Sequence, residues 1–281
     1  MGIAIFWFLR HLAESQEKKT ARALVKQARD LAAFNLTSFQ DVGDVLWLEQ
    51  RAGPNQRLVK AFKIENSFTT TDIAWHKTFL AKADQSIQAI RGEAWAKLFG
   101  VAQQALDRAR VYIKIENRVG KSHVPLAKLV RITTFMTILN VLFGVNPADT
   151  AVEDVVTATD LINKLWIQSK DCSEEAISAD DQQRLQTVLA NMLPGTAVDP
   201  GPRENPLNSI IPAYETMWRV VLLTFVSAAF RVTDQETIDQ FARVVQSVPQ
   251  CLGHGEDNTD LRRALAFAKV CIPFLHVSRR E

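Results

Sequence analysis

The sequence lacks several of the patterns on which protein chemistry is most often built. Its 281 residues include only three cysteines, without regular spacing, so neither a disulfide framework nor a zinc site is predicted. A reducing, cytoplasmic location is the simplest expectation. The five histidines are scattered, and no two have the i, i+4 spacing of a helical zinc site. No Gly-x-Ser-x-Gly, Walker or Gly-x-Gly-x-x-Gly motif occurs, so hydrolase, nucleotide-binding and Rossmann functions have no support.

An excess of charge of either sign is also missing. Lys and Arg number 33 against 31 Asp and Glu, which leaves a net charge of +2, and no basic block stands out. Nucleic-acid-binding surfaces are strongly basic, so we expect no nucleic-acid partner.

A long hydrophobic run is missing from the N-terminus as well. Residues 3–9 are apolar, but this segment is far shorter than the roughly 20 residues that span a bilayer. It has no basic flank of the kind that precedes a signal peptide core. Two interpretations stay open, a helix that packs on the domain or a peripheral membrane contact.

What the sequence does have is apolar content and helical periodicity. At 47% hydrophobic residues, the chain can bury a substantial core, and we expect a single domain over 1–281. We divide it into an N-terminal helical segment, 1–54, and a helical core, 55–281. Residues 205–230 are too long and apolar for a strand, with Pro206 and Pro212 near their start. They predict one long, largely buried helix.

The rest of the core is predicted to be mainly α with a few short strands. Residues 53–55 (Gly-Pro-Asn) predict a turn, and 57–64 fit either a strand or a helix. Residues 111–115 alternate well enough to predict a strand. Helical periodicity predicts helices at 12–34, from Thr70 or Thr71 through Phe79, and at 84–110, 126–144, 149–170, 178–193, 233–248 and 261–272.

Residues 212–216 (Pro-Ala-Tyr-Glu-Thr) follow the order small, small, any, acid, Thr. This order resembles the oxygen-activation segment of the central I helix of cytochromes P450, especially fungal ones. Residues 66–77 resemble the beginning of the P450 C helix, and 126–144 resemble the E helix with its Leu-Phe-Gly end. The helices at 149–170 and 178–193 resemble the F and G helices. The resemblance covers roughly residues 55–281 and implies a P450-like helical shell.

Three features that hold haem in that family are not matched. The chain stops before the loop whose Cys thiolate binds the iron. The Glu-x-x-Arg pair of the K helix would fall on Phe267 and Val270, and the propionate-binding Arg of the C helix would fall on Phe79. We therefore expect a shell that lacks the haem-ligand region, with neither haem, zinc nor any other cofactor.

The predicted central helix carries a polar group near its middle. With 3.6 residues per turn, Glu215 and Arg219 share a face. They could form a simple intrahelical salt bridge. Alternatively, Glu215 could line a cavity in which a substrate replaces haem, because an acid in apolar surroundings can donate a hydrogen bond or shuttle a proton.

The resemblance extends to short, haem-less, P450-like fungal pericyclases of sordarin-type terpenoid pathways. It implies a cofactor-independent intramolecular Diels–Alder cyclisation of a hydrophobic terpenoid-type substrate in secondary metabolism. Glu215, Tyr214 or His76 would then donate a hydrogen bond to the substrate carbonyl. The expected substrate-binding residues are Trp75, Trp166, Asn208, Ile211, Pro212, Thr216, Met217 and Arg219.

Two other functions stay open. One is a non-catalytic degenerate P450 that carries a hydrophobic ligand or partners an active P450. The other is a haem-free isomerase or cyclase that uses acid–base chemistry.

Overall fold

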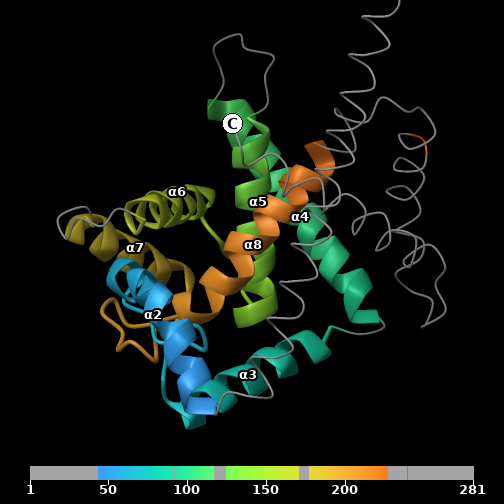
Figure 1. The fold of residues 1–281 in the computed structure, drawn as a ribbon. Coiled ribbons are helices and arrows are strands. Elements are labelled where there is room, and N and C mark those ends of the chain that lie inside the picture. The colour runs from blue at the N-terminus through green and yellow to red at the C-terminus, as the bar shows by residue number, and fades with distance from the viewer. Residues whose placement is uncertain (1–43, 91–92, 117–124, 171–176, 227–238, 240–281) are drawn as a thin grey trace, which may run out of the picture.

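The computed structural model describes residues 44–90, 93–116, 125–170, 177–226 and 239. Every regular element in these ranges is helical, which confirms the mainly α prediction (Figure 1). The elements are α2 (Asp44–Phe62), α3 (Ile73–Gln88), α4 (Glu93–Glu116), α5 (Leu126–Phe143), η1 (Pro147–Asp149), α6 (Val152–Gln168), α7 (Ala179–Met192) and α8 (Leu207–Val226). The apolar segment 3–9 and the helices predicted at 12–34 and 261–272 lie outside the described residues. The same holds for the helix predicted at 233–248 except for residue 239, which is helical.

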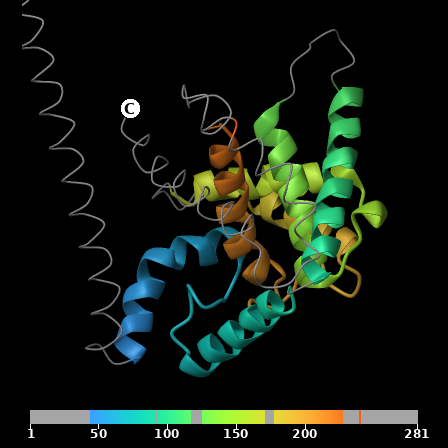
Figure 2. The same ribbon diagram turned by 90° about the vertical axis from the view of Figure 1, so that its right-hand side faces the viewer.

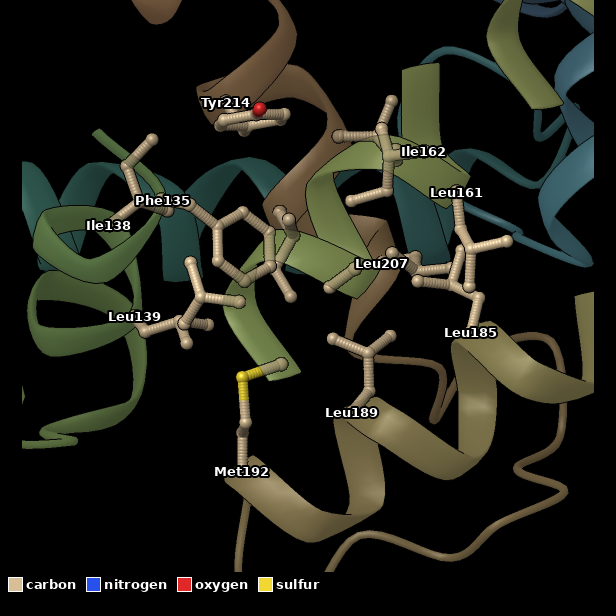
Figure 3. Close-up of a cluster of buried hydrophobic side chains, with 14 of the residues drawn as sticks. Phe135, Ile138, Leu139, Leu161, Ile162, Leu185, Leu189, Met192, Leu207 and Tyr214 are labelled. Carbon is tan, nitrogen blue, oxygen red and sulfur yellow. The ribbon is translucent and has the colours of Figure 1, made fainter. Parts of the chain in front are cut away.

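Helix α5 lies at the centre of the fold. It packs against α4, α6 and α8, and α6 packs in turn against α7. Figure 2 shows α2 and α3 together at one end of this arrangement. The core forms where the four inner helices meet, and side chains from α5, α6, α7 and α8 point into it (Figure 3). Each such buried apolar side chain contributes about 1.5–3 kcal/mol.

The ends of α5 follow from its flanking residues. Pro125 precedes the first turn, where a missing amide proton costs nothing. Gly144 ends the helix in the left-handed conformation, with φ of 69°, and its amide donates to the carbonyl oxygen of Asn140 at 2.9 Å. The helix predicted here, including its glycine end, is confirmed.

The strand predicted at residues 111–115 is wrong, because these residues belong to α4. Ala105, Ala109 and Ile113 are fully or almost fully buried at i, i+4 spacing, whereas Val111 and Ile115 are more than half exposed. Five residues of alternating polarity are compatible with a strand or with a helix. Here they are helical because one face of α4 packs on α5.

The turn predicted at residues 53–55 is also wrong, since Pro54 lies inside α2. Pro54 has no amide proton to donate within the helix. It lies on the solvent side of α2, where both Gly53 and Pro54 are exposed. The side-chain amide of Asn55 donates to the carbonyl oxygen of Arg51 at 3.0 Å, which supports the backbone at this point. The undecided segment 57–64 is helical to Phe62, and Lys63 ends α2 with φ of 52°.

The predicted helix 84–110 is divided, because α3 ends at Gln88 and α4 begins at Glu93. The predicted start of α3 shifts as well. Its N-cap is Asp72 rather than Thr70 or Thr71, and the Asp72 carboxylate accepts from the amides of Ala74 and Trp75.

Helix α8 is described over residues 207–226 of the predicted 205–230, and it is buried over its first half only. Its buried residues run from Leu207 to Glu215. Met217, Val221 and Phe225, further along, are between 39% and 46% exposed. The expectation of a largely buried helix therefore holds where α8 crosses α5 and fails beyond that crossing (Figure 1).

Helices α5 and α8 are also long and apolar enough to span a membrane, judged by length and composition alone. The same is true of many core helices of soluble proteins. Here both contribute buried side chains to the core, among them Phe135 and Tyr214.

Candidate functional site

Hydrogen bonds from three asparagine side chains fix the start of α8. The Asn205 side-chain amide donates to the carbonyl oxygens of Phe62 at 3.0 Å and Lys63 at 3.2 Å. The Asn208 amide donates to the carbonyl oxygen of Pro202 at 2.7 Å, and Asn66 donates to the carbonyl oxygen of Asn208 at 3.2 Å. Asn208, which we predicted to bind substrate, thus joins the loop before α8 to the segment between α2 and α3.

Trp75 and His76 belong to the same region. The Trp75 indole N–H donates to the carbonyl oxygen of Glu65 at 2.8 Å, and the Arg203 guanidinium lies 5.2 Å from the centre of the Trp75 ring. Arg203 also bonds to Glu65 at 2.7 Å and Asp72 at 3.0 Å. The His76 ring meets Trp47 edge-on at 5.6 Å. These contacts give Trp75 and His76 structural partners at the junction of α2 and α3.

The Glu215 and Arg219 pair lies further along α8. The carboxylate Oε2 of Glu215 pairs with Nη1 of Arg219 one turn later, as the spacing predicted. The Glu215 side chain is 5% exposed and that of Arg219 is 29% exposed. In its ionised form a carboxylate accepts hydrogen bonds and has no proton to donate, so the ion pair makes Glu215 an acceptor, and its expected role as a donor stays a prediction.

Two indole rings surround this ion pair. The Arg219 guanidinium lies 4.5 Å from the centre of the Trp218 ring and 5.8 Å from that of Trp166 on α6. Arg57 of α2 lies 4.7 Å from the same Trp166 ring, and its Nη1 donates to the Ser169 hydroxyl at 2.8 Å. Cation–π contacts therefore bring α2, α6 and α8 together at this point.

Tyr214 faces the core beside the ion pair. It is fully buried, and its ring meets Phe135 of α5 edge-to-face at 5.1 Å (Figure 3). Burial raises the pKa of the Tyr214 hydroxyl; by smaller amounts, the charge of Arg131 lowers it and the charge of Glu215 raises it. The hydroxyl therefore stays protonated at neutral pH and is available as a hydrogen-bond donor.

Three buried polar atoms within one turn of α8 have no hydrogen-bond partner in the part of the chain that the structure describes. They are the Tyr214 hydroxyl, Oε1 of Glu215 and Nε1 of Trp218. A buried polar atom without a partner costs about 1–3 kcal/mol, so three in one turn are unusual for a purely structural element. Other such atoms on α8, in Asn208 and Thr224, lie about 9 Å along the helix in either direction.

We call Tyr214, Glu215, Trp218 and Arg219, together with Trp166, the central-helix site. Ile211 is buried and Pro212 half-buried one turn before it. Thr216 and Met217 are exposed and do not join the buried group. Trp218 was not among the predicted site residues, although its position four residues after Tyr214 placed it on the same helical face.

Within the described ranges, no group of three or more His, Cys, Asp and Glu side chains is placed to hold a metal ion. All three cysteines lie outside these ranges. Comparisons with protein-family models, with curated proteins and with solved structures find no match.

Proposed function

We propose that the chain is a haem-less, P450-like helical protein that binds a hydrophobic terpenoid-type molecule at the central-helix site. There it catalyses an intramolecular Diels–Alder cyclisation without a cofactor. The observation that carries this proposal is a pair of donors on one face of α8, the Tyr214 hydroxyl and Nε1 of Trp218, which have no partner among the described residues. The P450-like pattern at 212–216 supports it, because the pattern falls on the helix that crosses α5.

The reaction makes modest chemical demands. Four π electrons of a diene and two of an alkene become two new carbon–carbon σ bonds and one new carbon–carbon double bond. No atom leaves and no proton is transferred. The protein has to fold the substrate into a reactive shape and withdraw electron density from the alkene through a conjugated carbonyl.

Tyr214 and Trp218 are suited to the second task. A carbonyl oxygen has two lone pairs and can accept one hydrogen bond from each donor. Their i, i+4 spacing puts both donors on the same side of α8. The indole of Trp166 supplies an apolar wall for the substrate, and the Glu215–Arg219 pair fixes the positions of the surrounding side chains. In this scheme His76 takes no part in the reaction.

The test uses purified protein and a linear diterpenoid aldehyde that carries a conjugated diene and an α,β-unsaturated carbonyl. Chiral chromatography follows the rate of cyclisation and the ratio of stereoisomers. We expect faster cyclisation and one dominant stereoisomer. Unchanged rate and product ratio in the presence of protein would contradict the proposal. Binding without such a change would support the carrier function instead.

Tyr214→Phe removes one of the two donors and is expected to slow cyclisation by about tenfold, the equivalent of one hydrogen bond. Tyr112→Phe is the matched control, because Tyr112 on α4 is the second of the two tyrosines and its contact is to Lys128. The control is expected to cyclise the aldehyde at the wild-type rate.

A further inference from the structure

Oε1 of Glu215 is the polar atom that the proposed reaction leaves unused. Its side chain is 5% exposed, and the other carboxylate oxygen is taken by Arg219. Oε1 itself has no hydrogen-bond partner among the described residues. A charged acceptor left without a partner in a buried position is more costly than a neutral one, so a ligand that donates a hydrogen bond here gains affinity.

The surroundings restrict what that donor can be. The guanidinium groups of Arg219 and Arg57 both lie within 6 Å of the centre of the Trp166 ring and disfavour a cationic ligand group. A carboxylate or phosphate has no proton to donate to Oε1. A primary amide would bring two N–H donors that both need acceptors, whereas Oε1 of Glu215 is the carboxylate oxygen of this turn that has no partner among the described residues. A hydroxyl group brings one donor and adapts its orientation by rotation.

We propose that Glu215 recognises a hydroxyl group of the substrate, so that the substrate class is an apolar molecule with a hydroxyl close to its conjugated carbonyl. This inference rests on the proposed function for the position of the carbonyl. Glu215 directly follows Tyr214 and lies three residues before Trp218, so the hydroxyl and the carbonyl are bound within the same turn of α8. The hydroxyl is therefore expected on a carbon near the carbonyl carbon.

The hydrogen bond between the substrate hydroxyl and Oε1 of Glu215 determines which molecules the site binds most tightly. A hydrogen bond to a buried charged group corresponds to roughly a tenfold to hundredfold change in affinity. A molecule that lacks the hydroxyl leaves Oε1 without a partner and also displaces any water that could reach it. The protein therefore binds the hydroxylated molecule more tightly than its otherwise identical deoxy analogue.

The experiment compares two diterpenoid aldehydes that differ only by one hydroxyl two carbons from the aldehyde carbon. Quenching of tryptophan fluorescence gives the Kd of each, with Trp166 and Trp218 as reporters. In wild type we expect the hydroxylated aldehyde to bind about tenfold to a hundredfold more tightly. In Glu215→Leu,Arg219→Met, which removes both charges together, we expect the two Kd values to become equal. Glu153→Gln, an exposed position in the first turn of α6, is the matched control and keeps the wild-type ratio.

Equal Kd values for the two aldehydes in wild type overturn the inference, and so does a ratio that survives in the double variant. Binding of neither aldehyde overturns it too. The wild-type comparison needs no substitution, so it does not depend on whether the double variant folds. Discrimination without cyclisation of either aldehyde would contradict the proposed function while supporting the hydroxyl contact. Cyclisation of both aldehydes with equal Kd values would support the proposed function and contradict the hydroxyl contact.

Discussion

Glu215 and Arg219 form an ion pair in which the acid is almost fully buried while the base reaches solvent. Removing one member alone leaves the other without its counter-charge, which costs more than replacing both by apolar side chains. This asymmetry makes the pair the most informative place to test the energetics of α8.

We expect Arg219→Met to lower the free energy of unfolding by about 1–3 kcal/mol, because it leaves the Glu215 carboxylate buried and unpaired. Glu215→Leu,Arg219→Met is expected to lie within about 1 kcal/mol of wild type. Urea unfolding followed by circular dichroism measures both. A single variant as stable as the double one would show that the carboxylate finds another partner.

Tyr214→Phe is expected to raise stability while it lowers activity. The hydroxyl of Tyr214 is buried and has no partner in the described ranges of the chain, so removing it relieves a desolvation cost of about 1 kcal/mol. The ring contact with Phe135 is kept. Thermal unfolding of this variant beside Tyr112→Phe checks the sign. A loss of stability confined to Tyr214→Phe would mean that its hydroxyl bonds within the protein.

Replacing two glycines by alanine, Gly144 and Gly100, is expected to change the free energy of unfolding in opposite directions. Gly144 has φ of +69°, a conformation that costs a residue with a Cβ about 1–2 kcal/mol, so Gly144→Ala is expected to destabilise. Gly100 lies inside α4, and a Cβ there meets nothing within 4 Å. Gly100→Ala is therefore expected to stabilise by about 0.5–1 kcal/mol. Equal shifts in Tm for the two variants would contradict the assignment of Gly144 as the cap of α5.

Stability is expected to fall in acid partly because of Asp181 at the start of α7. Its hydrogen bond with Lys164 of α6, at 2.5 Å, lowers the pKa of the Asp181 carboxyl, and burial opposes this effect. The folded-state pKa then lies below the unfolded value of about 4. The contribution is present above that value and is lost as pH falls through the folded pKa.

Unfolding measured between pH 3 and pH 7 for wild type and Asp181→Asn tests this. The two proteins should differ most at neutral pH and converge in acid. Asp180→Asn, at the exposed neighbouring position, is expected to follow the wild-type profile. A constant difference at every pH would assign the effect to packing and not to charge.

Local features were predictable because their causes are local. Gly144 marked the end of α5, since a left-handed cap depends on the missing Cβ of one residue. Helical spacing placed Glu215 and Arg219 on one face, and the salt bridge between them was one of the two alternatives that this spacing allowed. The predictions that proved wrong concerned short sequence patterns that are compatible with two kinds of secondary structure. Residues 111–115 and 53–55 were assigned to a strand and a turn, whereas packing on α5 and an exposed position for Pro54 allow helix at both.

The sequence by itself therefore determined that the chain forms apolar helices and where α5 ends, and it placed Glu215 and Arg219 on one face of α8. Only the tertiary structure decided that Trp166 meets Arg219 and Arg57, that Asn208 and Trp75 hold the loop before α8, and that Thr216 faces solvent. The physical reason is that capping and i, i+4 pairing act within one turn of a helix. Which face of α8 is buried depends instead on side chains of α2, α5 and α6, which are distant in sequence.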